Sequence, residues 1–394
     1  MRLLHVSIHL NVLTKDMRIL IGGDLKPTKR DIEFFTLGNE GKIWGDLSEE
    51  IKHADFAIAN LETPLIEKET PIDKSGAVFG SPKEVLNAVK NVNISFLNLA
   101  NNHILDHGEE GLRTTIKALK DYEFDFSGAG ESLKIASKPF TKKIKNKVIS
   151  ILSYSEEEFN IATNKNGGGN PLDIIDFVKK IKRLKVESDF MILLYHGGKE
   201  NYMLPTPKQQ KLCKFFIEEG VNMVVCQHSH TAGAYEEHAG GVIFFGQGNF
   251  VFDPYPVKRD WLYKGFLIDV VLNENNDFQY KLLPYVHNSL NSKEVGIRLM
   301  NSQESEEYLN YIESFNKKMA NNPDFVTEEW DKLSSSLENT YLSVLNGNGR
   351  ILRKINEKTS FLRSIYRNKR KLVLKNYITC ETHQEILQTI LKRK

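Results

Sequence analysis

The chain has 394 residues and a formal net charge of +2; 40% of its residues are hydrophobic and 26% are charged. This length suggests two domains, or one large domain with an appendage, and the composition is that of a soluble globular protein with an ample core. The small net charge argues against a global attraction to nucleic acid. Three cysteines at no metal-like spacing argue against a disulfide framework and suit a reducing compartment.

The N-terminus gives no sign of a signal peptide or an anchor. No segment approaches the roughly 20 apolar residues that span a bilayer. Residues 1–16 lack a long apolar core and carry His5, His9 and Lys15, whereas Met17 opens a natural first strand. We therefore expect residues 1–16 to be an N-terminal extension that is dispensable or lies upstream of the native start. The expected location is cytoplasmic, with peripheral contact to the membrane as an alternative.

Apolar, β-rich runs alternate with amphipathic helical patterns from Arg18 to about Val271, which predicts an α/β chain. Helices at 111–120, 174–184 and 207–219 are long enough to connect parallel strands. Strands are predicted at 19–22, 56–60, 94–100, 148–154, 190–195, 223–226, 242–245 and 266–271.

The pattern changes after residues 280–291, which we interpret as a strand and its exit. Helices are predicted at 304–319 and 328–345, so we expect one domain over 17–295 and a helical region over 296–394. Residues 350–394 hold thirteen Lys or Arg against three Asp or Glu, with apolar residues at helical spacing. This basic tail either packs its apolar stripe on the main domain or contacts an anionic polymer or a membrane surface. No recognised nucleic-acid motif accompanies it.

Five of the predicted strands end in side chains that can bind metals or move protons. Taken alone, each of these residues is better explained by a structural role, such as a cap, a turn or a loop residue. The repetition favours a site, because α/β folds build sites at the carboxyl ends of their strands, and we expect the residues at one rim of the sheet. They are Asp24, Asn60, Glu62, Asn102, His103, Asp106, His196, His228 and His230.

This set of side chains suits a transition metal. Oxygen ligands combined with neutral imidazoles favour Mn, Fe or Zn, since calcium and magnesium sites use few histidines. One aspartate, one glutamate, one asparagine and three histidines are enough for two ions, which together can activate water and clamp a phosphoryl group. His228 and His230 are the strongest pair, because alternate residues of an extended segment point the same way.

These motifs resemble the CapA family, the bacterial capsule-synthesis or poly-γ-glutamate-synthesis proteins of the calcineurin-like metallophosphatase superfamily. The similarity runs from about Arg18 to Asp253, roughly three-fifths of the chain. It implies a four-layer α/β/β/α metallophosphatase-like sandwich with a C-terminal helical extension. The motifs that carry it are Gly23-Asp24, Asn60-Leu61-Glu62, Ala100-Asn101-Asn102-His103 with Asp106, His196-Gly197-Gly198, His228-Ser229-His230 and Gly248-Asn249-Phe250.

The resemblance also implies roles for the site residues. His103 stabilises the transition state or protonates the leaving group, and Asp106 is grouped with it as catalytic. The implied activity is a metal-dependent phosphoesterase, a hydrolase of capsule polysaccharide biosynthesis acting on a phosphorylated envelope-sugar or capsule intermediate. The alternative is a non-hydrolytic binding or assembly subunit for capsule polymer synthesis or export. The implied ligands of two divalent ions are Asp24, Glu62 (bridging), Asn102, His196, His228 and His230.

Three further residues near the site, Lys26, Asn249 and Glu200, are each open to two interpretations. The superfamily often has a histidine at the position where this chain has Lys26. A charged lysine has no lone pair to bind a metal. Either one metal loses a ligand, or Lys26 faces a phosphate. Asn249 either hydrogen-bonds a ligand such as Asp24 or His230, or serves a tight turn. Glu200 is either an acid that supports the site or contacts substrate, or a solvated loop residue. The sequence indicates no oligomeric state.

Overall fold

The computed structural model describes residues 16–346, 349–367, 369–379, 383 and 387. They belong to two compact units, the first ending at Pro323 and the second beginning at Asp324. The expected N-terminal extension lies outside the described residues except for Asp16. The domain boundary expected at 295 falls inside the first unit, because β16 (Ile297–Leu299) and α9 (Ser302–Asn321) continue that unit.

One half of the first unit is an eight-stranded sheet in the order β16-β15-β14-β1-β2-β3-β4, with β13 paired to β1. The run from β1 to β4 is parallel, whereas β14, β15 and β16 are antiparallel. The strands are β1 (Met17–Leu25), β2 (Phe56–Leu61), β3 (Ile94–Asn98), β4 (Asp125–Ser127), β13 (Asn249–Val251), β14 (Lys264–Leu272) and β15 (Phe278–His287).

The other half is a six-stranded sheet in the order β11-β12-β10-β9-β7-β6. Its central strands β7, β9, β10 and β12 are parallel. The strands are β6 (Phe140–Ile144), β7 (Lys147–Ser155), β9 (Phe190–His196), β10 (Met223–Gln227), β11 (Tyr235–His238) and β12 (Gly241–Phe244), and a separate pair joins β5 (Ala129–Gly130) to β8 (Gly168–Gly169).

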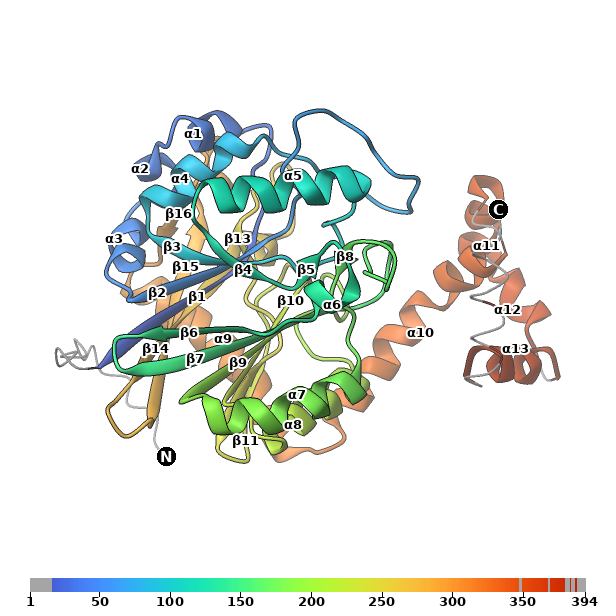
Figure 1. The fold of residues 1–394 in the computed structure, drawn as a ribbon. Coiled ribbons are helices and arrows are strands. Elements are labelled where there is room, and N and C mark those ends of the chain that lie inside the picture. The colour runs from blue at the N-terminus through green and yellow to red at the C-terminus, as the bar shows by residue number, and fades with distance from the viewer. Residues whose placement is uncertain (1–15, 347–348, 368, 380–382, 384–386, 388–394) are drawn as a thin grey trace. The chain divides into compact units, whose positions relative to one another are not determined.

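Helices cover the outer face of each sheet. Figure 1 shows α1 to α5 on one side of the stacked sheets and α7 and α8 on the other. Besides α9, the longer helices of this unit are α5 (Gly108–Asp121), α7 (Ile174–Glu187) and α8 (Pro207–Glu218). The shorter ones are α1 (Ile32–Thr36), α2 (Glu40–Trp44), α3 (Leu47–Lys52), α4 (Leu86–Asn91) and α6 (Leu133–Ala136), with 3-10 turns η1 (Lys83–Val85), η2 (Asp260–Tyr263) and η3 (Asn288–Leu290).

Two hydrophobic cores follow from the alternation of side chains along each strand. On β1, Ile19 and Ile21 point between the sheets and join Ile192 and Leu194 of β9 in one buried cluster. Leu20 points the other way, into a second cluster with residues of α1 to α5. The first unit is therefore a four-layer α/β/β/α sandwich, and the expected fold class is confirmed.

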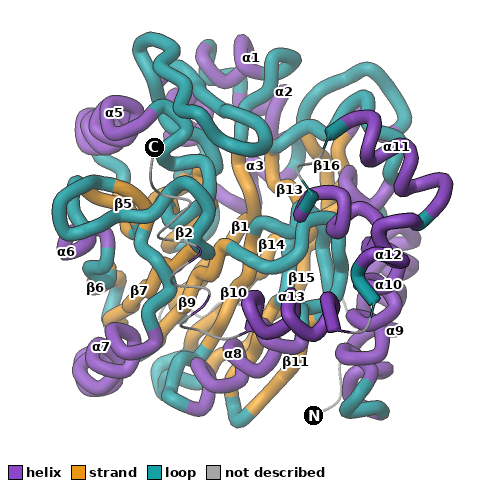
Figure 2. The backbone as a smooth tube through the Cα atoms, turned by 90° about the vertical axis from the view of Figure 1, so that its right-hand side faces the viewer, coloured by secondary structure: helices purple, strands orange, loops and turns teal. Residues whose placement is uncertain are grey.

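All eight strands predicted over 19–271 are present, although the strand predicted at 94–100 ends at Asn98. One expectation was wrong in detail. The chemistry-bearing strand ends do not share the rim of a single sheet, because β1, β2 and β3 belong to one sheet and β9 and β10 to the other. The site is assembled from the carboxyl ends of strands in both sheets. Figure 2 shows the strands of the two sheets lying together inside the surrounding helices.

The second unit is helical, as expected for the end of the chain. It contains α10 (Phe325–Leu345), α11 (Arg350–Thr359), α12 (Phe361–Ile365) and α13 (Lys369–Thr379). The buried Asn356 joins three of these helices, since its Nδ2 donates to the Asn339 carbonyl at 2.8 Å and its Oδ1 accepts from the Leu362 N–H at 3.0 Å. Within the described residues, no helix is long and apolar enough to cross a membrane.

Candidate metal centre

The carboxylate of Glu62 lies at the centre of the site, just after β2. Its side chain is 0% exposed, and neither carboxylate oxygen has a hydrogen-bond partner among the described residues. Burial, together with the nearby Asp24, raises the pKa of Glu62 well above its usual range. Burying a carboxyl group without partners is costly, so this arrangement indicates a cation-binding site rather than a structural role.

Two groups of potential ligands share this glutamate. Glu62, His196 and His228 form one, and Asp24, Glu62 and His230 form the other, with the ligand atoms of each group within 4.8 Å of one another. A carboxylate common to two such groups can bridge two ions. The imidazole and carboxylate donors therefore fit divalent metal ions, as expected from the sequence.

The first group has a fourth donor in Asn102. Its Oδ1 lies 3.0 Å from His196 Nε2, which is also 3.2 Å from His228 Nδ1 and 3.6 Å from Glu62 Oε1. Three potential ligand atoms thus lie within 3.6 Å of His196 Nε2. Next to this group, Asn60 Nδ2 lies 3.2 Å from His196 Nδ1 and donates to Asp24 Oδ1 at 2.8 Å. Asn60 therefore contacts one residue of each group, and its hydrogen bond positions the Asp24 carboxylate.

In the second group the histidine is His230, whose orientation is set by Asn249. Asn249 Oδ1 lies 3.0 Å from His230 Nδ1, so this nitrogen carries the proton. His230 Nε2 is then left as the ligand atom, 3.8 Å from Glu62 Oε1. Of the two interpretations of Asn249, the structure thus favours the hydrogen bond to a ligand; the residue of the turn at positive φ is Gly248.

The His228-Ser229-His230 segment differs from its sequence prediction. It follows β10 as a bend rather than an extended strand, and both histidines have positive φ, 89° for His228 and 57° for His230. Such a conformation costs on the order of 1 kcal/mol or more per residue, and it concentrates at functional sites. The bend sends the two imidazoles to different ligand groups, which an extended segment with both side chains on one face would not do.

His103 lies beside the ligands in a hydrogen-bonded relay. Its Nδ1 is 2.6 Å from Asp106 Oδ2, and its Nε2 faces Glu62 Oε1 at 3.9 Å. The Asp106 carboxylate also pairs with Lys74 at 2.7 Å and accepts the Phe79 N–H at 2.7 Å. Because the carboxylate can only accept, Nδ1 donates and Nε2 is directed into the site.

Burial is the largest influence on the pKa of three site histidines. It lowers the pKa of His103 and His228, and it lowers that of His196 well below the usual range. The neutral imidazole that results is the form that binds metal ions.

Lys26 is held between two aromatic rings instead of among the ligands. Its Nζ lies 4.2 Å from the ring centre of Phe79 and 4.7 Å from that of Phe252, within the range of cation–π interactions. Phe79 stacks on His103 and Phe252 packs edge-on against His230. The pKa of Lys26 is lowered by burial, and the negative charges of Asp31 and Glu62 offset part of this effect. The lysine thus places a cation at the edge of the site.

Several site residues were not anticipated from sequence. Glu158, in the loop after β7, accepts from Asn102 Nδ2 at 3.3 Å and lies 3.9 Å from His228 Nε2. Glu158 could have been predicted from its place just after β7, since the other site residues also follow strand ends. Lys74 and Phe79 come from the irregular loop after β2, which carries no pattern. Glu200, by contrast, is exposed and acts on Glu62 and His228 only through its charge.

Fold and site together define a candidate metal-binding protein with an α/β/β/α sandwich. The sequence model of the family described as bacterial capsule synthesis protein PGA_cap matches residues 18–254. The chain belongs to this family, and the resemblance noted from the motifs is thereby confirmed.

Individual relatives agree with this assignment. The chain is 30% identical over 220 residues to the capsule biosynthesis protein CapA of Bacillus anthracis, a match that covers 54% of each chain. It is 29% identical over 236 residues to the PGA biosynthesis protein CapA of Bacillus subtilis, covering 59% of this chain and 61% of the relative. The matches therefore span less than two thirds of these relatives' own length.

Solved structures are more distant. A putative 5'-nucleotidase from Staphylococcus aureus, solved in complex with alpha-ketoglutarate, aligns with a TM-score of 0.46 at 11% identity, covering 74% of this chain and 57% of that one. A hypothetical protein from Thermus thermophilus aligns with a TM-score of 0.43 at 11% identity, covering 68% and 99% of the two chains.

Proposed function

We propose that this protein is a metal-dependent phosphoesterase of capsule biosynthesis, which hydrolyses a phosphate ester of a phosphorylated envelope-sugar or capsule intermediate. The observation that carries the proposal is Glu62, a fully buried carboxylate that has no hydrogen-bond partner in the described part of the chain and is shared by two ligand groups. The membership of the chain in a capsule synthesis family supports the biological setting. We propose two ions of Mn, Fe or Zn and a cytoplasmic location.

The residues have separable tasks in this proposal. Asp24, Glu62, Asn102, His196, His228 and His230 would hold the ions. When bound, two divalent ions supply Lewis acidity and lower the pKa of water enough for it to act as a nucleophile near neutral pH.

His103 and Lys26 act on the substrate itself. The Asp106 carboxylate fixes the His103 ring with Nε2 directed at the reacting group. A bound phosphoryl anion favours the protonated imidazole, which can donate a proton to the leaving oxygen. The Lys26 ammonium lies at the edge of the same site and attracts the anionic end of the substrate.

The test measures metal content and hydrolysis together. The purified protein is stripped with a chelator, reloaded with Mn, Fe or Zn, and assayed with an aryl phosphate and an aryl phosphodiester. Glu62→Gln is expected to lose bound metal and to lose more activity than the roughly 10–100-fold typical of residues that only support a ligand. Glu67→Gln is the matched control, because Glu67 is exposed and lies five positions further along the chain.

Two results would count against hydrolysis. Protein that retains none of the three metals fails the first part of the proposal. The second result combines two experiments: the purified protein retains metal through Glu62 but cleaves neither ester, and cells that carry Glu62→Gln produce capsule at an unchanged level. Together these outcomes would favour the alternative of a non-hydrolytic binding or assembly subunit.

A further inference from the structure

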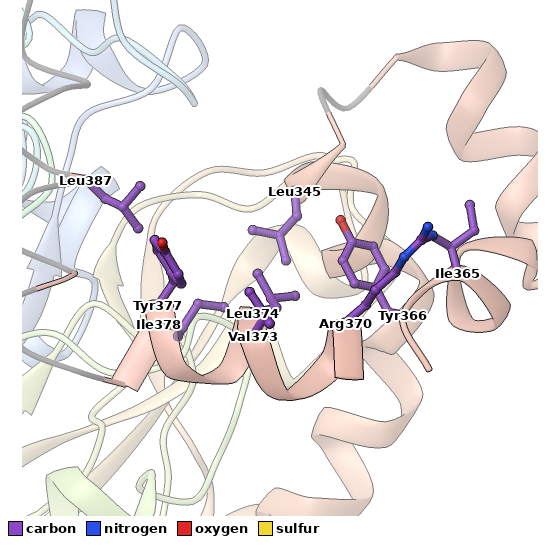
Figure 3. Close-up of a pocket in the computed structure, with 9 residues that line it drawn as sticks. All are labelled: Leu345, Ile365, Tyr366, Arg370, Val373, Leu374, Tyr377, Ile378 and Leu387. Carbon is purple, nitrogen blue, oxygen red and sulfur yellow. The ribbon is translucent and has the colours of Figure 1, made fainter. Parts of the chain in front are cut away.

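The second unit contains an open apolar groove that no part of the metal site uses. It has a volume of about 1020 Å³ and lies between the end of α10 and the helices α12 and α13. Figure 3 shows Leu345 facing Val373 and Leu374 across it, with Arg370 at one end. Leu345 is 52% exposed, and Val373 is 50% exposed. Large apolar side chains exposed together in this way mark a binding surface.

The same unit is strongly basic. Between Arg350 and Thr379 the sequence has ten Lys or Arg residues, and Glu357 is the sole acid. Glu357 pairs with Arg353, and Glu338 of α10 pairs with Arg363. The ten basic residues against one acid leave α11 to α13 with an excess of positive charge, and Arg370 and Lys371 at the start of α13 are both exposed.

We propose that this unit binds peripherally to an anionic lipid bilayer, with lipid chains against the groove and phosphate head groups against the surrounding cations. Apolar contact and electrostatic attraction together are what hold a helical segment at a membrane interface. An anionic polymer would use the cations but leave the groove unfilled. A second copy of the chain would fill the groove but bring two strongly basic surfaces together, which is unfavourable.

The charge part of the proposal is tested by sedimenting the full chain with vesicles of phosphatidylcholine, with or without phosphatidylglycerol. Binding is expected only with the anionic lipid and is expected to weaken as salt is raised. Reversing two charges in the double variant Arg370→Glu, Lys371→Glu should weaken it about 25-fold or more, since each basic residue near the surface contributes about five-fold. Lys208→Glu, Lys211→Glu, an equal change on exposed positions of α8, should leave binding unaltered.

The apolar part is tested by Val373→Ser, which keeps every charge. It should weaken vesicle binding about ten-fold, because the side chain no longer gains from burial in lipid. Circular dichroism checks that both tail variants keep their helices, and the salt dependence of the unaltered chain tests the charge contribution even if one of them unfolds.

Three results overturn the proposal. The first is equal binding by Val373→Ser and the unaltered chain, which would mean that charge alone acts. The second is binding to poly-γ-glutamate without binding to anionic vesicles, which would identify a polymer site. The third is a stable dimer that does not bind vesicles and that dissociates in Val373→Ser, seen as a lower sedimentation coefficient. The groove would then be an interface between two copies of the chain.

Discussion

The ring of His103 is locked by Asp106: Nδ1 of the histidine lies 2.6 Å from Oδ2 of the aspartate, and both side chains are buried. The other oxygen of that carboxylate pairs with Lys74. One aspartate therefore fixes both the tautomer of the histidine and the position of a loop lysine, and these two effects can be separated by mutation.

Asp106→Asn should lower kcat about 10–100-fold, because the amide no longer fixes the His103 ring with Nε2 toward the substrate. It should also destabilise the protein by about 3 kcal/mol or more, because Lys74 keeps a buried charge without its partner. Kinetics on the aryl phosphate and urea unfolding measure the two effects. Asp121→Asn, on the exposed end of α5, is the control.

The double variant Asp106→Asn, Lys74→Met separates the two losses. Removing the lysine charge should restore much of the stability without restoring kcat. A double variant that regains both would mean that Asp106 contributes only to folding.

Removal of the metal should lower the thermal midpoint of the protein. An ion that binds the folded chain and not the unfolded one adds about 2.7 kcal/mol at a concentration 100 times its dissociation constant. We expect differential scanning calorimetry to show a higher midpoint with Mn than with chelator. The difference should disappear in Glu62→Gln and persist in Glu67→Gln; a difference that survives in Glu62→Gln would place the ion elsewhere.

The site residues that lie at the ends of regular strands could be predicted from the sequence. Asp24, Glu62 and His196 follow apolar runs that can only be buried strands, so their meeting at strand ends was predictable. The backbone at His228 and His230 was not. Nothing in the local sequence requires positive φ of a histidine, because it is the surrounding fold that imposes this conformation.

Residues from irregular loops escaped prediction for a different reason. Lys74 and Phe79 lie in a long connection after β2 that has neither the period of a helix nor that of a strand. Their places are set by contacts with Asp106 and His103, which are remote in sequence. Lys26 was noticed because it departs from a family pattern, yet its aromatic surroundings depend on two such loops.

The packing between the sheets should support the site directly. Leu194 is fully buried in the inter-sheet core, two residues before His196. Leu194→Ala should cost about 2–5 kcal/mol of unfolding free energy, because it removes buried contacts and leaves a cavity. Val186→Ala, at a position that is 87% exposed, should cost less than about 0.5 kcal/mol. Equal urea midpoints for the two variants would contradict the assignment of this core.

Asp31 should make stability depend on pH. Burial raises the pKa of its carboxyl from 3.8 to about 6, and Oδ2 has no hydrogen-bond partner among the residues that the structure describes. The folded protein holds this proton more tightly than the unfolded chain does. The stabilising contribution is therefore complete below about pH 3.8 and is lost as the pH rises to about 6.

Asp31→Asn removes this titration and keeps an oxygen that can accept from Thr28. Between pH 4 and pH 7 the stability of the variant should improve relative to the unaltered protein by about 2–3 kcal/mol. Urea unfolding across this range measures the difference. The exposed Asp260→Asn should show no such trend, and a parallel pH dependence in the unaltered protein and Asp31→Asn would exclude Asp31 as its source.

Lys26→Met should change metal and phosphate binding in opposite directions. The methionine keeps an apolar stem between Phe79 and Phe252 but removes the ammonium. A divalent ion at Asp24, Glu62 and His230 then meets less repulsion, whereas an anion loses an attractive partner; each effect should be about ten-fold. Metal titration and inhibition by inorganic phosphate measure them separately. The exposed Lys29→Met should alter neither, and a loss of both affinities in Lys26→Met would indicate that the lysine maintains the shape of the site rather than its charge.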